Sequence, residues 1–312
     1  MRPSVSFLVA TYNRVGLVQQ CVRSILEQTY ENIEIIVIDD ASTDGTESSL
    51  KAEFGEKIKY LRNNINRGVA YSRNFALGYA GGKYIGLLDS DDLLLDKDHV
   101  RNVVKNLEDN PQISMVACDV YCLDLEGAKV YEKTFFQTVI DHRDADLSSG
   151  IKDFEYVFCH GIHSCGAVFR KDITKEIGFL NTNYKIAWDE DFFLRLAACD
   201  KFKIYYQNCP SAGYRLHNSS FSRNLSELYR EKIRARKNII RSNISLKFRL
   251  GRVFKKRMAN QYYCLSDAYL KEKRPFYSLF AAFKAIIIDP SIILTGINKI
   301  SSPRRNTSAP LN

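Results

Sequence analysis

The sequence predicts an α/β protein with a mostly parallel central sheet, helices on both faces of that sheet, and a helical region at the C-terminal end. Apolar runs rich in β-branched residues alternate with helix-like stretches through the first half of the chain. These runs are almost continuously apolar, which is typical of parallel strands buried on both faces. From Leu225 onward the chain is expected to be helical and basic.

The expected elements follow one another in a regular order. Strands are expected at 5–10, 33–40, 57–63, 83–89 and 113–121. Helices are expected at 16–28, 42–54, 68–80 and 96–109, between and after these strands. Beyond about residue 130 the pattern is looser, with a short strand at 167–170 and a helix that begins at Trp188. Acidic residues in the first turn of that helix suit the positive end of its dipole.

Charge divides the chain into two parts. The 312 residues carry a formal net charge of +9, with 45% hydrophobic and 26% charged residues, as in an ordinary soluble protein. Residues 223–305 hold 20 Lys and Arg against 5 Asp and Glu, whereas the first 222 residues have a net charge of −6. The basic part is therefore expected to meet an anionic surface.

The cysteines and the apolar stretches indicate a cytoplasmic protein. The eight cysteines show no CxxC pair or regular spacing, which predicts free thiols in a reducing compartment. The N-terminal apolar run is too short for a signal peptide. The longest apolar stretch is interrupted by Lys284, Asp289 and Pro290, so no ordinary transmembrane helix is expected.

Polar segments follow four of the predicted strands. They read "ATYNR", "DDAST", "NNINR" and "DSDD". In open α/β sheets, ligands bind at the carboxyl ends of the strands. Each segment alone is compatible with a solvated loop, but together they predict a binding site at one edge of the sheet.

The "DSDD" segment is the strongest candidate for a metal site. On an extended backbone, side chains two residues apart point the same way, so Asp89 and Asp91 are expected to face one point. Two carboxylates with substrate phosphates suit Mg²⁺ or Mn²⁺. The alternative is a plain loop in which Asp92 caps the next helix.

Two further segments favour a nucleotide. Asp39 and Asp40 end the second strand, where a carboxylate can accept hydrogen bonds from a ribose or a base. A dinucleotide-binding domain would need GxGxxG after the first strand, which "ATYNRVGL" lacks. A receiver domain would lack the "DSDD" segment. Arg73, on the helix before the fourth strand, is either a phosphate partner or a surface arginine.

The combination of motifs resembles family-two glycosyltransferases, which are inverting enzymes of the GT-A fold that use nucleotide-diphosphate sugars. The motifs are "VSFLVATYNR", "IIVIDDAST", "NRGVAYSRNFAL", "GKYIGLLDSDD", "AVFRKDITKEIGFL" and "WDEDFFLRLA", in order, over Pro3 to Ser222. The resemblance implies a Rossmann-like catalytic domain at 1–222. A basic helical extension at 223–300 and a disordered tail at 301–312 lie outside it.

The resemblance also implies roles for individual residues. The nucleotide donor would be bound by Ala10, Thr11, Tyr12, Asp40, Arg73, Asp89 and Ser90. The metal, Mn²⁺ or Mg²⁺, would be held by Asp89 and Asp91, with His217 in "YRLHNSSF" as a third ligand or phosphate contact. A plain loop histidine is the alternative at position 217.

The catalytic base implied by the resemblance is an acid at the start of the helix "WDEDFFLRLA". An inverting transfer needs one carboxylate to take the proton of the acceptor hydroxyl. Counting back from Arg195 favours Asp189, but Asp191 in the second acidic pair remains open. Trp188 stands where the family has a Glu, and either packs on a sugar or is an ordinary buried indole. His160 and His163 are not expected to bind zinc.

The predicted function is therefore a metal-dependent glycosyltransferase that uses a nucleotide sugar, with UDP as the default, in cell-surface polysaccharide or lipopolysaccharide synthesis. The acceptor would be a glycan or a lipid-linked saccharide. The basic helices would contact an anionic membrane surface at the inner face, with a solvated helical bundle as the alternative and no nucleic acid expected. The competing functions are a sugar nucleotidyltransferase, which would need a Gly-rich loop after the first strand, and a non-catalytic glycan- or partner-binding member of the fold.

Overall fold

The computed structural model describes residues 4–138, 145–217 and 224–292. The chain divides into two compact units, Met1–Phe221 and Ser222–Asn312, and each is considered by itself. The predicted tail at 301–312 lies outside the described residues.

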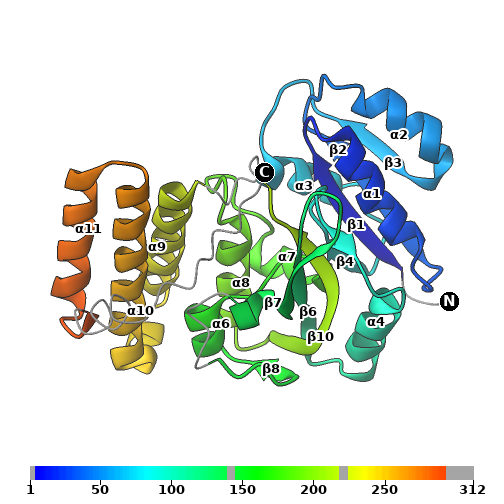
Figure 1. Cartoon of the computed structure of the whole chain (residues 1–312). Coiled ribbons are helices and arrows are strands. Elements are labelled where there is room, and N and C mark those ends of the chain that lie inside the picture. Colours follow the sequence, from blue (N-terminus) through cyan, green and yellow to red (C-terminus); the bar gives the residue numbers. More distant parts are fainter. Residues whose placement is uncertain (1–3, 139–144, 218–223, 293–312) are drawn as a thin grey trace. The chain divides into compact units, whose positions relative to one another are not determined.

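The first unit is built on one large sheet (Figure 1). In spatial order its strands are β3 (Lys59–Arg62), β2 (Ile33–Asp39), β1 (Val5–Thr11), β4 (Tyr84–Leu87), β9 (Val168–Arg170), β6 (Ile113–Leu123), β10 (Lys203–Arg215) and β5 (Leu93–Leu94). Two further strands lie off this path: β7 (Lys129–Thr134) pairs with β6, and β8 (Gly150–Lys152) pairs with β10.

Parallel pairing dominates the sheet. The strands β3, β2, β1 and β4 pair with one another in parallel, in that order, and β6 is parallel to β10. Strand β9 runs antiparallel between β4 and β6 and joins the two parallel parts. The predicted mostly parallel α/β fold is therefore confirmed.

Helices flank the sheet, as the strand–helix alternation predicted (Figure 1). They are α1 (Val15–Leu26), α2 (Thr46–Phe54), α3 (Val69–Leu77), α4 (His99–Asp109), α5 (Phe135–Thr138), α6 (Phe154–His160), α7 (Ile173–Ile177) and α8 (Trp188–Ala198), with a 3₁₀ turn η1 at Gly55–Lys57. In α1 the residues facing the sheet are apolar at three- and four-residue spacing, which is the pattern of an amphipathic helix.

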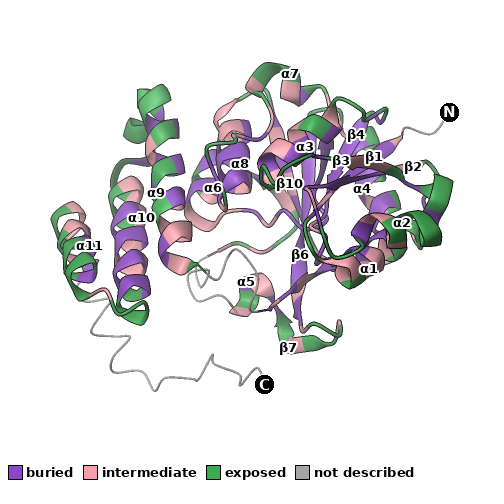
Figure 2. Cartoon of the chain, turned by 90° about the horizontal axis from the view of Figure 1, so that it is seen from above, coloured by how far each residue is buried: buried purple, intermediate pink, exposed green. Residues whose placement is uncertain are grey.

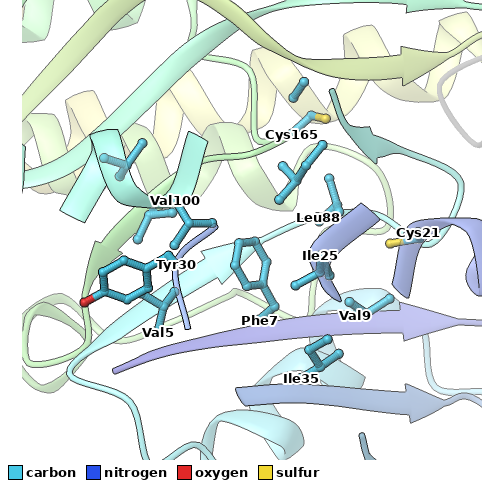
Figure 3. Packing of buried hydrophobic residues seen from close by; sticks show 14 of the residues in the cluster. Val5, Phe7, Val9, Cys21, Ile25, Tyr30, Ile35, Leu88, Val100 and Cys165 are labelled. Carbon is cyan, nitrogen blue, oxygen red and sulfur yellow. The ribbon is translucent and has the colours of Figure 1, made fainter. Parts of the chain in front are cut away.

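The main core lies between β1, its neighbouring strands and the helices that cover them (Figure 3). Val5, Phe7 and Val9 of β1 are fully buried, and they pack in one cluster with Ile25 of α1 and Val100 of α4. The strand is buried on its other face as well, so apart from Ser6 and the terminal Thr11 its sequence is apolar without alternation. All eight cysteines are free, as expected.

One long strand was not expected from the sequence. Strand β10 spans 13 residues and carries Pro210 in its middle. Its pairing with β6 shifts register between Gln207 and Ala212, and such a bulge accommodates a proline that cannot donate a ladder hydrogen bond. The strand matters for the site because its end delivers Arg215 and, just beyond it, His217.

Over its described residues, 224–292, the second unit is formed by the helices α9 (Leu225–Ser242), α10 (Ile244–Lys271) and α11 (Pro275–Ile288). Asn224 caps α9 by accepting a hydrogen bond from the amide of Glu227 at 3.2 Å. Gly251 interrupts the helical geometry of α10 with a φ of 49°. The predicted C-terminal helical region is confirmed. Within the described ranges, no helix is both long enough and apolar enough to cross a membrane.

Candidate functional site

The carboxyl ends of β1, β2 and β4 meet at one edge of the sheet. The three strands are parallel, and β1 lies between the other two. The amide of Asp40, just after β2, donates to the carbonyl of Thr11 at the end of β1 at 2.9 Å. Asp89 follows β4 at the same edge. The fold therefore brings together the polar strand ends that the sequence singled out.

The segment from Asp89 to Asp92 is a turn and not the extended segment that the sequence analysis assumed. The amide of Asp92 donates to the carbonyl of Asp89 at 2.9 Å, which closes the turn. The side chains of Asp89 and Asp91 are 35% and 12% exposed, whereas Asp92 is buried. Ser90, between the first two, is also buried. The turn thus presents two carboxyl groups and hides the third.

Asp91 is the meeting point of two segments far apart in the sequence. Its Oδ2 accepts a hydrogen bond from Arg14 Nη1 at 2.7 Å and lies 2.8 Å from His217 Nε2. Burial by itself would raise the pKa of this carboxyl group. The hydrogen bond from His217 and the positive charge of Arg14 outweigh burial and hold the pKa below its usual range. The surroundings of Asp91 therefore favour its charged form, which is the form in which a carboxylate can bind a cation.

Asp92 has the opposite environment. Its Oδ1 accepts a hydrogen bond from the amide of Arg215 at 3.0 Å, while its Oδ2 is buried without a hydrogen-bond partner among the described residues. Burial, and then the charges of Asp91 and Asp89, raise the pKa of Asp92 well above its usual range. This carboxyl group belongs to the interior of the turn. It is not the cap of helix α4, whose N-cap position is Asp98.

Arg215 supports the turn from inside. Its guanidinium is buried, donates to the carbonyl of Asp91 at 3.1 Å, and also donates to the side chain of Gln20 on α1. Burial lowers the pKa of Arg215, although the neighbouring acidic groups oppose this. Strand β10 and helix α1 are thus both connected to the turn.

Arg73 fixes Asp89 by hydrogen bonds from the protein interior. Its guanidinium is fully buried and donates to Asp89 Oδ1 at 2.8 Å, to the carbonyl of Leu88 at 2.8 Å and to that of Leu8 at 3.1 Å. It also stacks over the ring of Trp188 at 4.7 Å. The side chain is not the surface arginine considered from the sequence. These contacts fix the position of Asp89 and link α3, β4 and α8.

The carboxylate of Asp40 is hydrogen-bonded by neighbouring residues of the protein. Its carboxylate accepts hydrogen bonds from Asn63 Nδ2 at 2.8 Å, from the amide of Arg67 at 2.9 Å and from that of Gly68 at 2.7 Å. These bonds hold the loop before α3, which carries Arg73. Asp40 was predicted to bind the nucleotide base; in this structure the residue organises the loop beside the predicted base pocket.

The first-strand residues predicted to bind the base differ in exposure. Tyr12 is 42% exposed, Ala10 is half-buried and Thr11 is buried. The hydroxyl of Thr11 has no hydrogen-bond partner within the described ranges. An exposed aromatic ring next to backbone at a strand end is a surface on which a base can stack.

The two candidate bases at the start of α8 have different surroundings. Asp191 is buried and its Oδ2 accepts from Arg195 Nε at 2.8 Å, while Arg195 also donates to the carbonyls of Ile177 and Phe179. Asp189 is half-buried in the first turn, where its Oδ1 accepts from the amide of Glu190 at 2.8 Å. Asp191 is thus linked to α7 through Arg195. Separately, the ring of Trp188 places the start of α8 beside Arg73.

The donor set suits a divalent cation that is shared with a substrate. Asp89 and Asp91 offer carboxylate oxygens, and His217 adds an imidazole nitrogen beside Asp91. Among the described residues, no three His, Cys, Asp or Glu side chains gather into a complete metal cage. Mg²⁺ and Mn²⁺ are commonly held by one or two carboxylates together with substrate phosphates, so the residues present fit such an ion.

Two residues of this site were not identified from the sequence. Arg14 lies three residues after the end of β1, at the N-cap of α1, and could have been suspected from "ATYNR", where a basic residue stands at a predicted ligand edge. Arg215 also had a signal, the Arg-x-His spacing with His217 in "YRLHNSSF", but it was given no role of its own and the strand that carries it was not predicted. Each supplies a positive charge near the Asp89–Asp92 turn.

Comparison with known families and proteins gives a consistent result. Residues 6–178 match the model of glycosyl transferase family 2. An uncharacterized glycosyltransferase of Haemophilus influenzae is 28% identical over 78% of this chain and 74% of its own length. The Escherichia coli UDP-Glc:alpha-D-GlcNAc-diphosphoundecaprenol beta-1,3-glucosyltransferase WfaP is 30% identical over 73% of this chain and 83% of its own.

Solved structures share the fold. The mannosyltransferase PcManGT of Pyrobaculum calidifontis, in complex with GDP-Man and Mn²⁺, has a TM-score of 0.62 at 20% identity and covers 96% of this chain and 80% of its own. Residues 1–349 of Staphylococcus aureus TarS with UDP-GlcNAc have a TM-score of 0.60 at 15% identity, over 94% and 92% of the two chains. At these identities the likeness establishes the fold alone.

Proposed function

Because the chain belongs to glycosyltransferase family 2, we propose that it moves a sugar from a nucleotide-diphosphate donor to a lipid-linked saccharide, by an inverting, metal-dependent reaction. The chain is a glycosyltransferase of the GT-A fold. The observation that carries the finer proposal is the convergence of Arg14, Asp91 and His217 at the carboxyl edge of the sheet. These side chains come from segments more than seventy residues apart, and they create a charged site where such sheets bind ligands.

We assign the nucleotide to the ends of β1 and β2, with UDP as the default. Ala10, Thr11 and Tyr12 would contact the base, and the loop held by Asp40 would form the wall beside it. UDP is favoured because WfaP, at 30% identity, is named for UDP-Glc and TarS has been solved with UDP-GlcNAc. Because PcManGT has been solved with GDP-Man, a guanosine-diphosphate sugar is the alternative donor that the experiment must distinguish.

The diphosphate would lie over the Asp89–Asp92 turn. A bound Mn²⁺ or Mg²⁺ would be held by Asp89, Asp91 and His217 and would supply positive charge to the departing nucleotide diphosphate. Arg14, which donates to Asp91 in this structure, would donate to a phosphate oxygen of the bound donor. Arg73 would act as a positioning residue that keeps Asp89 in place.

We assign proton transfer to Asp189. The acceptor hydroxyl gives its proton to the Asp189 carboxylate as its oxygen forms a bond to the anomeric carbon. The bond between that carbon and the phosphate oxygen breaks on the opposite face, and the nucleotide diphosphate leaves with the electron pair. Asp191 is the less suitable base because its ion pair with Arg195 is part of the packing between α8 and α7.

The proposal of a lipid-linked acceptor rests on the relatives of the chain and on its basic helices. WfaP is named for an acceptor linked to diphosphoundecaprenol, and ExoO of Rhizobium meliloti, 30% identical over 42% of this chain, is named for succinoglycan biosynthesis. A lipid-linked acceptor lies at a membrane surface. The basic helices α9 and α10 would bring the chain to the anionic inner face of that membrane.

Calorimetric titration of UDP with Mn²⁺ or with EDTA tests the donor site. We expect metal-dependent binding in the wild type and its loss in Asp91→Asn, because the variant lacks a charged ligand. Asp109→Asn is the matched control, since Asp109 is an exposed acid at the end of α4. Binding of GDP instead of UDP would change the donor, whereas no binding of any nucleotide would overturn the proposal.

A further inference from the structure

Helix α11 buries small side chains and exposes large apolar ones. This is the reverse of what is expected of a helix whose apolar face packs only within its own unit. Its buried residues, Ser278, Ala281 and Ala285, are all small. Its exposed residues are nearly all large and apolar: Phe276, Tyr277, Leu279, Phe280, Phe283, Ile286 and Ile287. In Figure 2, much of α11 is accordingly coloured as exposed. Large apolar side chains normally face a core, so this face lacks the environment that its composition requires.

The exposed apolar residues form one stripe. Phe276, Phe280, Phe283 and Ile287 follow one another at spacings of three or four residues, which places them on one side of the helix. Phe276 is 84% exposed and Phe283 is 61% exposed. The buried Ala281 and Ala285 lie on the opposite side, against α10. A continuous apolar stripe of this kind marks an interaction surface.

Positive charge accompanies the stripe. Lys284 Nζ lies 4.2 Å from the ring centroid of Phe280, and the guanidinium of Arg274 lies 4.3 Å from that of Tyr277. The first half of α10 carries six basic residues and no acidic one: Lys247, Arg249, Arg252, Lys255, Lys256 and Arg257. Over residues 224–292 there are 16 Lys and Arg against 5 Asp and Glu.

The pairing of α10 with α11 brings these two features together. The hydroxyl groups of Ser266 and Ser278 are 2.9 Å apart, and Lys284 lies over the ring of Tyr262 at 5.7 Å. These two contacts fix an antiparallel register, in which the last turn of α11 lies beside the region of Arg257. The C-terminal end of the apolar stripe therefore lies beside the end of the basic half of α10, within one unit.

We propose that α11 lies flat in the interfacial layer of an anionic lipid membrane, with its apolar stripe among the acyl chains and the basic half of α10 on the head groups. A helix with aromatic and aliphatic residues on one face and lysine and arginine beside them has the chemistry of an interfacial helix. A second copy of the chain is the poorer occupant, because two such basic units repel each other. The inference deepens the membrane contact of the proposed function but rests on different residues from the donor site.

Co-sedimentation of the full chain with vesicles tests the proposal. The vesicles contain phosphatidylcholine alone or roughly equal parts of phosphatidylcholine and phosphatidylglycerol. The triple variant Phe276→Ser, Phe280→Ser, Phe283→Ser should bind the anionic vesicles at least about tenfold more weakly than the wild type. These side chains are already exposed, so the variant should keep the helical content and thermal stability of the wild type.

The matched control removes three exposed apolar side chains from the first unit. Leu26, Leu125 and Ile151 are 41%, 48% and 50% exposed, and the variant with serine at all three should bind vesicles like the wild type. A second variant, Lys247→Gln, Arg249→Gln, Lys255→Gln, Lys256→Gln, should lose most of the preference for phosphatidylglycerol. Equal binding by the wild type and the phenylalanine variant would overturn the proposal.

Two further readouts separate the alternatives. Phe280→Trp should give an indole emission that shifts to shorter wavelength on addition of anionic vesicles and is quenched by lipids brominated on the acyl chains. A dimer in sedimentation that is lost in the phenylalanine variant, without any vesicle binding, would assign the stripe to a second copy and overturn the proposal. UDP binding is measured in each variant, so failure of the donor site and failure of the membrane contact are distinguished.

Discussion

Asp91 and Asp92 are adjacent in the sequence, yet their carboxyl groups have opposite electrostatic environments. Asp91 meets Arg14 and His217, which keep its pKa low. Asp92 faces the interior, where burial and the two neighbouring carboxylates keep its pKa high. One turn therefore keeps a carboxylate charged beside Arg14 and His217 and disfavours a second charge in its interior. The raised pKa of Asp92 favours its neutral form, which limits the repulsion within the acidic cluster.

The first prediction concerns the pH dependence of stability of Asp92→Asn. The folded pKa of Asp92 is raised, so its contribution to stability is complete below the unfolded value of about 4 and is lost as the pH rises through the folded pKa. Asparagine does not titrate and resembles the protonated acid in shape. The variant should therefore gain stability relative to the wild type between pH 5 and pH 8, by on the order of 1 kcal/mol. Urea denaturation in EDTA measures this difference.

Asp91→Asn serves as the comparison, and the expected sign is reversed. The folded pKa of Asp91 is lowered, so its ionised form stabilises the chain above about pH 4 and this stabilisation is lost as the pH falls through the folded pKa. The variant should be less stable than the wild type at pH 7, and the difference should shrink on acidification. A gain of stability in both variants would contradict the assignment of opposite charge states.

The second prediction separates Asp189 from Asp191. Asp189→Asn should lower kcat by about 10² to 10⁴-fold with little change in unfolding free energy, because it removes a proton acceptor. Asp191→Asn should lower the unfolding free energy by about 1–3 kcal/mol, because it leaves Arg195 without its buried carboxylate partner. Steady-state transfer assays and urea denaturation are compared for both variants. The reverse distribution of effects would assign the base to Asp191.

At the scale of elements, β1 and β4 approach each other closely at one pair of residues. Phe7 of β1 pairs with Gly86 of β4, and a Cβ atom at Gly86 would lie 2.6 Å from the Phe7 ring. Phe7 is also one of the buried residues of the main core. Strand β4, which leads to Asp89, is thus fitted to the central strand through a glycine, and its position depends on that fit.

The third prediction follows from this contact. Gly86→Ala should lower the unfolding free energy by about 1–3 kcal/mol, because the ring of Phe7 is enclosed and must shift. Gly16→Ala is the control, since no atom lies within 4 Å of a Cβ built at Gly16 in helix α1. The control should be neutral or stabilising by up to about 1 kcal/mol. Equal destabilisation by both substitutions, measured by urea denaturation, would show that the Phe7 contact is unimportant.

The elements also show what sequence patterns can and cannot predict. The parallel strands around β1 were predicted because burial on both faces leaves a continuous apolar run. Strand β10 was not predicted, because Pro210 and Gly213 interrupt its pattern and because its pairing includes a bulge. The turn at Asp89 was assumed to be extended, since a two-residue spacing of acids fits either conformation. Arg14 was missed, and Arg215 was noted only within the Arg-x-His spacing with His217, because their contacts with the acidic turn arise from the tertiary structure.

At the scale of the whole molecule, the two units differ in net charge. The first 222 residues have a net charge of −6, and residues 223–305 have a net charge of +15. The sequence predicted this division and a possible role for the basic helices, but it did not reveal the apolar stripe of α11. That stripe follows from which side of the helix packs against α10, which composition alone does not determine.

The last prediction uses this division of charge. Raising the salt concentration from about 0.1 M to about 1 M shortens the screening length from about 10 Å to about 3 Å. Binding of the full chain to anionic vesicles should therefore weaken by at least about tenfold, because most of the attraction comes from the exposed basic residues of the second unit. Metal-dependent binding of UDP should change much less, since Asp91, His217 and Arg215 are buried and are screened weakly. Co-sedimentation and calorimetry on the same preparation measure both effects, and a parallel loss of the two would mean that the basic helices act on the donor site itself.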